Sequence, residues 1–240
     1  MPSPLLSVVI PVFNEAENIE PLLREVVAAL DGRWPYEVIF TDDCSADATL
    51  AELQKLKAVF PQLRVVQHLV RSGQSAAVRS GVKVAQGDWI ATLDGDGQND
   101  PADIPALFDH ALKGGADLGL VGGLRLKRQD NWSKKIATKI GNGVRQFLLR
   151  DGCRDTGCGL KVFRREAFLD MPFFAALHRF LPALFQSRGW KTEFLPVNHR
   201  HRLRGVSKYG NLQRGLVGIV DLLGVLWLRA RARAPKVREL

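Results

Sequence analysis

Short apolar runs alternate with amphipathic segments along the first part of the chain. The apolar runs are typical of buried strands and occupy residues 5–13, 36–41, 63–69 and 88–93. The segments between them carry apolar residues at helical spacing and predict helices over residues 15–31, 45–60 and 74–86. Asn14 is expected to cap the first helix. Strands separated by helices need crossover connections, so the pattern predicts an α/β protein with a mostly parallel sheet flanked by helices.

The pattern becomes less regular after the fourth apolar run. The helices expected here span residues 101–113, 132–149 and 173–188. The strands expected here span residues 116–123 and 190–197, and a glycine-bounded loop covers 205–210. Pro182 is expected to break the last helix. Since no linker rich in proline or serine divides the chain, we expect one domain with an elaborated second half.

Composition and charge narrow the choice of partners. The chain has 240 residues, of which 46% are hydrophobic and 25% charged, as in an ordinary globular protein. The net charge of +9 arises entirely from residue 188 onward. Such an imbalance indicates a face that meets something anionic, which can be nucleic acid, a lipid surface or a phosphate-bearing substrate.

The cysteines and the ends of the chain bear on its location. Cys44, Cys153 and Cys158 have no CxxC spacing, so they predict reduced thiols and neither a disulfide framework nor a zinc site. The first residues show no secretory signal. Residues 216–228 are shorter than the about 20 residues that span a bilayer, and they contain Asp221. We therefore expect a cytoplasmic protein without a transmembrane helix.

Polar clusters follow three of the predicted strands. They are Asn14-Glu15, Asp42-Asp43 and the run from Asp94 to Gln98. Ligands of open parallel sheets bind where the strands end, and carboxylates on an exposed turn can hold Mg²⁺ or Mn²⁺ together with phosphates. An ordinary Asp-Gly turn is the structural alternative. The sequence lacks the ligand spacing of an EF-hand, a GxxxxGK[ST] phosphate loop and a GxGxxG dinucleotide motif, which leaves a nucleotide held by metal and carboxylates.

These clusters belong to seven segments that resemble, in order, the motifs of the family 2 glycosyltransferases. The subgroup most similar in pattern contains the dolichyl-phosphate mannosyltransferase-like enzymes, which use polyprenyl phosphates. The matching segments are 11–15, 42–49, 71–76, 94–101, 155–161, 178–181 and 204–209. The resemblance extends over residues 5–229. It implies a Rossmann-like nucleotide-sugar-binding fold of the glycosyltransferase A type.

The resemblance also implies an inverting, metal-dependent transfer of a hexose from GDP-mannose or a UDP-sugar to a polyprenyl phosphate. By position in the motifs, the donor-binding residues are Pro11, Asn14, Glu15, Asp42, Asp43 and Gln74. The residues expected around Mg²⁺ or Mn²⁺ and the diphosphate are Asp94, Asp96 and Gln98. A metal that bridges the phosphates stabilises the charge of the departing nucleoside diphosphate. Asp94, Asp96 and Asp155 are the candidate catalytic acids.

The acceptor side is expected to be basic. A lipid phosphate is already anionic at neutral pH, so its enzyme needs positive groups more than a general base. Segments that resemble acceptor-side motifs contain Arg125, Arg128, Ser133, Lys134, Arg204, Ser207 and Lys208. Asp155 is a base, an orienting group or a turn aspartate, and Lys134 with Lys135 can equally be the solvated face of a helix.

The C-terminal segment is expected to determine where in the cell the protein acts. Residues 212–229 form an amphipathic pattern, and the basic tail 230–240 suits anionic headgroups. The alternative is that this helix packs on the protein's own sheet. Many family members continue into transmembrane helices, so we expect peripheral docking at the inner face of the membrane or a separate membrane-embedded partner protein. The domain 1–229 would then comprise a nucleotide-sugar-binding half (5–123), an acceptor-side half (124–211) and this helix.

Two other functions remain open from the sequence. A transferase that acts on a sugar hydroxyl of a growing cell-surface glycan would need a general base, for which Asp155 is the candidate. A nucleic-acid-binding module is suggested by the basic composition. Single-strand binders interleave aromatic residues with basic ones, whereas residues 198–208 contain none. A degenerate transferase that acts as a scaffold is disfavoured by the intact metal motif.

Overall fold

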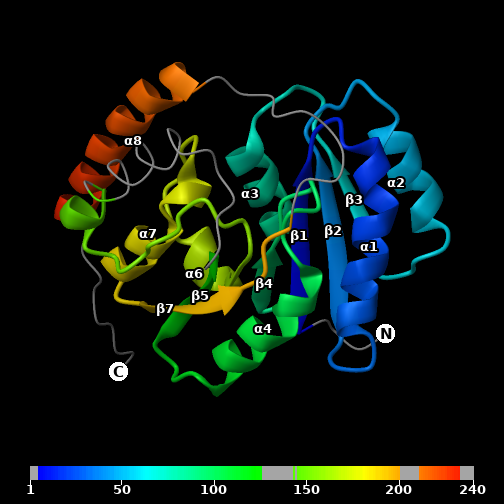
Figure 1. Cartoon of the computed structure of the whole chain (residues 1–240), viewed down its shortest axis with the longest axis horizontal. Helices are drawn as coiled ribbons and strands as arrows, with labels where there is room; N and C mark the ends of the chain where they lie inside the picture. Colours follow the sequence, from blue (N-terminus) through cyan, green and yellow to red (C-terminus); the bar gives the residue numbers. More distant parts are fainter. Residues whose placement is uncertain (1–4, 126–142, 144, 201–210, 233–240) are drawn as a thin grey trace, which may run out of the picture.

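The computed structural model describes residues 5–125, 143, 145–200 and 211–232. Its centre is a seven-stranded sheet in the order β3-β2-β1-β4-β6-β5-β7, with helices on both faces (Figure 1). The strands are β1 (Leu6–Val12), β2 (Tyr36–Asp42), β3 (Leu63–Gln67), β4 (Trp89–Thr92), β5 (Leu118–Arg125), β6 (Lys161–Arg164) and β7 (Lys191–Val197). The helices are α1 (Ala16–Leu30), α2 (Thr49–Lys57), α3 (Gln74–Val84), α4 (Ile104–Lys113), α6 (Arg165–Leu169), α7 (Leu181–Ser187) and α8 (Asn211–Arg231), with short 3₁₀ turns η1 (Pro101–Asp103) and η2 (Leu177–Arg179).

Alternation along the strands builds two apolar layers. Val8 and Ile10 of β1 face a core formed with α1, α2 and α4. Val9 between them faces the other core, formed with α3, α6 and α7. Successive strand residues point to opposite faces, so a strand covered by helices on both sides is apolar throughout. This explains why the first strand is a continuous apolar run in the sequence.

The predicted α/β class and mostly parallel sheet are confirmed. β1, β2, β3 and β4 pair in parallel, and β5 pairs in parallel with β7. The antiparallel strand β6 lies between β4 and β5 and was not predicted. It has four residues and is followed at once by α6, so it is too short to show a strand period.

Several predicted helix limits were also wrong. The helix expected over 45–60 is confined to Thr49–Lys57, because Asp42 and Asp47 accept hydrogen bonds from backbone N–H groups of Ser45 and Thr49 and hold a turn there. The break expected near Pro182 is confirmed, because Pro182 lies in the first turn of α7. The expected start at residue 173 was wrong, since only η2 precedes α7 and Ala176 has a φ of 65°. Only part of the helix expected over 132–149 lies within the described residues.

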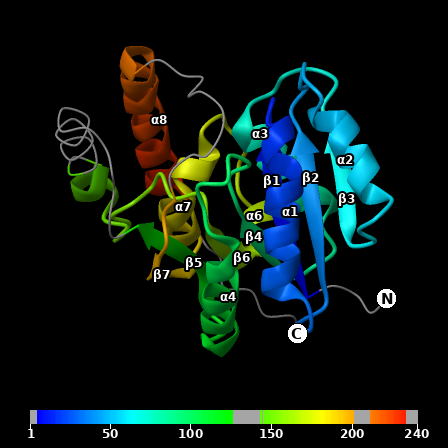
Figure 2. The same ribbon diagram turned by 45° about the vertical axis from the view of Figure 1, so that its right-hand side comes forward.

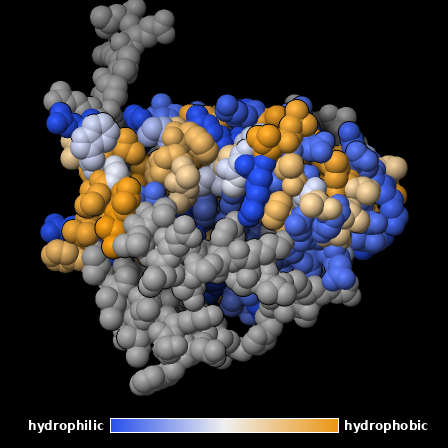
Figure 3. All heavy atoms as spheres, turned by 90° about the horizontal axis from the view of Figure 1, so that it is seen from above, coloured by the Kyte–Doolittle hydropathy of each residue, from blue (hydrophilic) through white to orange (hydrophobic). Residues whose placement is uncertain are grey.

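Helix α8 has two apolar faces, one packed against the domain and one exposed, and docking of the exposed face at a membrane stays a prediction. Val225 is fully buried, and Leu222 and Leu226 pack beside it against the domain. Ile219, Val220, Leu223 and Trp227 are 57%, 69%, 60% and 62% exposed on a second face. Figure 2 shows α8 far from α1 and α2, and Figure 3 shows hydrophobic surface over this end of the molecule. Among the described residues, no helix is both long and apolar enough to cross a bilayer.

Candidate functional site

The three predicted polar clusters meet at one edge of the sheet. β1 lies between β2 and β4 in the sheet, so the carboxyl ends of these strands are neighbours. The backbone N–H of Asp43 donates to the carbonyl of Val12 at 2.9 Å, which extends the pairing of β1 and β2 by one more residue. The run from Asp94 follows β4 on the other side of β1. This is the edge at which open parallel sheets bind their ligands.

The predicted role of Asn14 as a helix cap was wrong. Its φ of 53° turns the chain sharply, and helix α1 has Glu15 at its cap position. The Glu15 carboxylate accepts from Asn18 Nδ2 at 2.7 Å and makes no capping bond to the backbone. The Asn14 carboxamide oxygen instead accepts from the backbone N–H of Ala46 at 2.7 Å. In return, Ser45 Oγ and Thr49 Oγ1 accept from the N–H groups of Asn14 and Glu15 at 2.8 and 2.9 Å. The segments that follow β1 and β2 therefore hydrogen-bond to one another, which fixes both loops.

Asp43 organises the loop that follows β3. Its carboxylate, only 6% exposed, accepts from the N–H groups of Ser72 and Gly73 at 2.8 Å each. The ring nitrogen Nδ1 of His68 lies 2.8 Å from the same carboxylate. This arrangement holds Gly73 at a φ of 87°, directly before α3, and brings the Arg71 guanidinium 4.1 Å from the centre of the Phe13 ring. Asp43 thus shapes one wall of the site.

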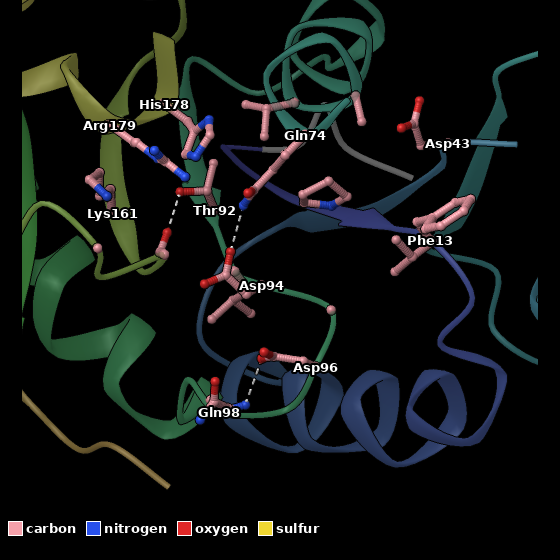
Figure 4. Close-up of a pocket in the computed structure, with 18 of the residues that line it drawn as sticks. Phe13, Asp43, Gln74, Thr92, Asp94, Asp96, Gln98, Lys161, His178 and Arg179 are labelled. Atoms are coloured by element: carbon pink, nitrogen blue, oxygen red, sulfur yellow. Dashed lines mark hydrogen bonds between the residues drawn. The ribbon is translucent and has the colours of Figure 1, made fainter. Parts of the chain in front are cut away.

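A pocket of about 530 Å³ opens beside these loops. Figure 4 shows Phe13 and Asp43 on one side, Lys161, His178 and Arg179 on the other, and Asp94 between them. The wall near Asp94 is completed by β4, by α3 and by residues 156–159. The pocket therefore has an aromatic end and a basic end, with carboxylates between them.

Asp94 is the central carboxylate. Gln74 Nε2 donates to Asp94 Oδ1 at 2.8 Å. Burial, and then the neighbouring charge of Asp96, raises the pKa of Asp94 to about 6, although the charges of Lys161 and Arg125 oppose the shift. A Cβ at Gly159 would lie 2.3 Å from Asp94 Oδ2, so only glycine leaves room for the carboxylate.

This carboxylate pair suits a divalent cation. Asp94 and Asp96 repel one another, as the raised pKa of Asp94 indicates, and a cation between them would relieve that repulsion. Carboxylate and amide oxygens are the ligands that Mg²⁺ and Mn²⁺ prefer, and Gln98 is the nearby amide. No group of three or more His, Cys, Asp or Glu side chains suited to a metal occurs among the described residues. Such a metal would therefore need further ligands from substrate phosphates and water.

The structure places the predicted site residues in three sets. Those that line the pocket are Pro11, Glu15, Asp43, Gln74, Asp94, Asp96 and Gln98. Those that lie behind its wall are Asn14, Asp42, Arg125 and Asp155. Those outside the described residues are Arg128, Ser133, Lys134, Arg204, Ser207 and Lys208. Most of the expected acceptor-side residues belong to the third set.

Asp155 is engaged by Arg125. The guanidinium donates from Nε to Oδ2 at 2.6 Å and from Nη2 to Oδ1 at 2.7 Å. The two side chains are 12% and 4% exposed. Burial alone would lower the pKa of Arg125, but the hydrogen bonds and charge of Asp155 raise it above its ordinary value. Of the alternatives for Asp155, this geometry favours an orienting group over a general base.

Asp155→Asn is expected to destabilise the fold by about 3 kcal/mol, because it leaves the guanidinium of Arg125 buried without a counter-charge. The double variant Arg125→Gln/Asp155→Asn should recover part of this loss. Asp170→Asn is the matched control: that carboxylate is 68% exposed and 3.6 Å from Arg188, so the change should stay within about 0.5 kcal/mol. Urea unfolding measures all three, and an Asp155→Asn protein of unchanged stability with an altered pH–rate profile would favour the general base.

Several pocket-lining residues were not predicted as site residues. Six of them are Phe13, Arg71, Thr92, Lys161, His178 and Arg179. All except Thr92 stand in segments that carry the family resemblance, so that resemblance was the available signal. Lys161 and Arg179 reach the pocket from the second half of the chain, and sequence spacing gives no sign of this proximity.

Comparison with known proteins identifies the family of the chain. The model of the family described as "Glycosyl transferase family 2" matches residues 7–171, and the chain belongs to this family. The chain is 36% identical over 242 residues to the dodecaprenyl-phosphate galacturonate synthase of Rhizobium johnstonii, with 95% of this chain and 68% of that protein covered. It is 39% identical over 208 residues to an undecaprenyl-phosphate 4-deoxy-4-formamido-L-arabinose transferase of Aeromonas hydrophila, with 86% and 63% covered. The chain thus spans about two thirds of the length of these relatives.

Solved structures show the same fold. A mannosyltransferase of Pyrobaculum calidifontis in complex with GDP-Man and Mn²⁺ superposes with a TM-score of 0.67 at 20% identity, covering 97% of this chain and 66% of that one. Glucosyl-3-phosphoglycerate synthase of Mycobacterium tuberculosis, with Mn²⁺, UDP and phosphoglyceric acid, gives 0.69 at 19% identity, covering 96% and 80%. The expected fold of the glycosyltransferase A type is confirmed.

Proposed function

We propose that the protein transfers a sugar from a nucleotide-sugar to a polyprenyl phosphate. The observation that carries the proposal is one pocket in which an aromatic end, a carboxylate pair and a basic end follow one another. A nucleotide-sugar and an anionic acceptor need these groups in this order. The names of the relatives support the acceptor class, because one is a dodecaprenyl-phosphate and the other an undecaprenyl-phosphate enzyme.

The donor would lie with its nucleoside between Phe13, Arg71 and the loop held by Asp43. Its diphosphate would then lie at Asp94 and Asp96, with Gln98 nearby. Mg²⁺ or Mn²⁺ bound there would supply charge stabilisation for the departing nucleoside diphosphate. Gln74 keeps Asp94 oriented through their hydrogen bond. GDP-mannose and UDP-sugars both remain candidates, since the contacts that read the base and the sugar hydroxyls are not assigned.

The transfer itself is a single displacement. An oxygen of the lipid phosphate attacks the anomeric carbon, and the bond from that carbon to the diphosphate oxygen breaks, with its electron pair leaving on the diphosphate. The configuration at the anomeric carbon is inverted. No proton has to be removed from the acceptor, so this chemistry needs no general base. The engagement of Asp155 by Arg125 is compatible with that requirement.

Access to a lipid acceptor requires proximity to a membrane. The exposed face of α8 is formed by Ile219, Val220, Leu223 and Trp227, and the exposed Arg231 follows near the end of the helix. Arg229 lies on the packed side, where its guanidinium donates to the carbonyl of Leu149. Apolar side chains with basic neighbours suit an anionic lipid interface. We therefore propose peripheral association at the inner face of the membrane, either by direct docking of α8 or through a membrane-embedded partner protein.

A transfer assay tests the proposed function. The purified chain is incubated with Mn²⁺ or Mg²⁺, a panel of labelled nucleotide-sugars and a short polyprenyl phosphate, and the product is extracted into organic solvent. Label in the organic phase that disappears with EDTA is the expected result and would also identify the sugar. Metal-dependent release of nucleoside diphosphate without label in that phase would overturn the lipid acceptor and favour a sugar hydroxyl.

A further inference from the structure

Two cationic side chains form the basic end of the pocket. Lys161 begins β6, opposite Thr92 of β4, and is 4% exposed. Its ammonium donates to the backbone carbonyl of Cys158. Within the described part of the chain, Lys161 forms no ion pair within 4 Å, although its charge acts on Asp94 and opposes the rise in the pKa of that carboxyl. An ammonium group has three donors, so two remain for an anion that enters the pocket.

Arg179 reaches the same end of the pocket from the turn η2. This turn follows Ala176, whose positive φ redirects the chain, and Figure 4 shows Arg179 close to Thr92 and Lys161. The turn is tied to the first turn of α3. Ser75 Oγ lies 2.7 Å from His178 Nδ1 and accepts from the backbone N–H of His178 at 3.4 Å.

The first turn of α3 therefore makes contacts on both sides of the pocket. Gln74 donates to Asp94, and the adjacent Ser75 holds His178. Ser75 is 4% exposed and lies 103 residues from His178 in sequence, so the contact depends on the completed fold. The contacts of Gln74 with Asp94 and of Ser75 with His178 are made by adjacent residues of α3, so together they hold Arg179 at a fixed place relative to Asp94.

We propose that Lys161 and Arg179 bind the phosphate of the acceptor, and that Ser75 and His178 are positioning residues that hold Arg179 in the pocket. The proposal rests on the proposed function. Phe13 and Asp43 line the end of the pocket proposed for the nucleoside. The diphosphate of the donor would lie at Asp94 and Asp96. The remaining anion of the reaction is the attacking phosphate, which must approach from the side away from the nucleoside. Lys161 and Arg179 occupy that side (Figure 4).

Two cations at this place serve binding and chemistry together. Charge-assisted hydrogen bonds fix a phosphate oxygen in one orientation, and Arg can donate two of them in parallel. They also offset the repulsion between the incoming phosphate and the donor diphosphate. The charge of Arg179 also offsets part of the rise that burial causes in the pKa of Asp221 in α8. Arg179 therefore interacts electrostatically with α8 as well, and the experiment must separate this interaction from phosphate binding.

Calorimetry with farnesyl phosphate tests the proposal, using protein saturated with Mn²⁺ and the nucleoside diphosphate that is its product. Arg179→Gln and Lys161→Met should each weaken farnesyl phosphate binding by about 10- to 100-fold, with the affinity for nucleoside diphosphate unchanged. His178→Ala should weaken it less, and His178→Asn, whose amide can still meet Ser75, should restore it. Arg188→Gln is the matched control, because Arg188 pairs with Asp170 at 3.6 Å and does not line the pocket.

Each other outcome overturns a defined part of the proposal. Weaker nucleoside diphosphate binding in Arg179→Gln would mean that Arg179 binds the donor and not the acceptor. If Arg179→Gln and Asp221→Asn lower the midpoint of thermal unfolding alike and farnesyl phosphate binds as before, Arg179 only anchors α8. Should the wild type bind phenyl phosphate through these residues yet transfer no sugar to any polyprenyl phosphate, the phosphate site stands and the proposed lipid acceptor fails. Normal transfer with unchanged farnesyl phosphate binding in both variants would leave the proposed function intact and remove this site.

Discussion

Asp96→Asn is expected to lower sugar transfer by about a hundred- to a thousandfold and to leave the fold intact. Asp96 Oδ1 accepts from the backbone N–H of Gln98 at 3.1 Å, and an asparagine carboxamide oxygen can accept the same bond. What the substitution removes is the charge that, together with Asp94, would hold the divalent cation on the donor diphosphate. The loss should therefore appear in turnover and in Mn²⁺ affinity, while the midpoint of thermal unfolding changes by no more than a few degrees.

The measurement compares initial rates at saturating donor over a range of Mn²⁺ concentrations. Asp88→Asn is the control for charge, since Asp88 is exposed and its described contact is made by its backbone carbonyl to Arg165. It should retain wild-type turnover. Retention of turnover by Asp96→Asn, with the same Mn²⁺ dependence as the wild type, would remove Asp96 from the proposed metal site.

The sheet and the position of the site follow from local patterns. Each of the first four strands is an apolar run bounded by a helical period, so strand identity, parallel pairing and the carboxyl-end location of the polar clusters could all be predicted. The antiparallel strand β6 could not, because four residues are too few to show a period and its neighbours in the sheet are distant in sequence. Local sequence patterns predict helices and strands well, but they predict the pairing of distant strands poorly.

The site residues show the same difference between what local sequence predicts and what long-range contacts decide. Asp94 and Asp96 lie in one short segment, so the sequence could suggest a cation site there, with an ordinary Asp-Gly turn as the alternative. The pairing of Arg125 with Asp155 joins residues 30 apart, whereas the sequence alone left Asp155 open as a base, an orienting group or a turn aspartate. Asn14 has the residue type of a helix cap, but its side chain meets Ala46 across the neighbouring loop. Residue type indicates what a side chain can do, and the fold decides which partner it meets.

Gly159→Ala should disable the site without removing any functional group. The added Cβ would lie 2.3 Å from Asp94 Oδ2 and 2.7 Å from Asn99 Oδ1. The loop cannot easily move away, because the carbonyl of Gly159 accepts a hydrogen bond from Thr92 Oγ1 at 2.8 Å. The Asp94 carboxylate must rotate instead and lose its bond from Gln74. We expect Mn²⁺ affinity to fall about 10- to 100-fold, as when groups that orient metal ligands are removed.

Gly224→Ala supplies the matched control for this substitution. Gly224 lies exposed in α8 with nothing within 4 Å of the position of an added Cβ, so alanine there should be neutral or stabilise the fold by up to about 1 kcal/mol. Gly159→Ala should cost about 1 to 3 kcal/mol in urea unfolding through overpacking. Calorimetric titration of Mn²⁺ into protein saturated with nucleoside diphosphate separates the two effects, since a purely structural cost would leave Mn²⁺ affinity unchanged. Undiminished affinity in Gly159→Ala would mean that Asp94 holds no metal, because its carboxylate could then be displaced without consequence for the cation.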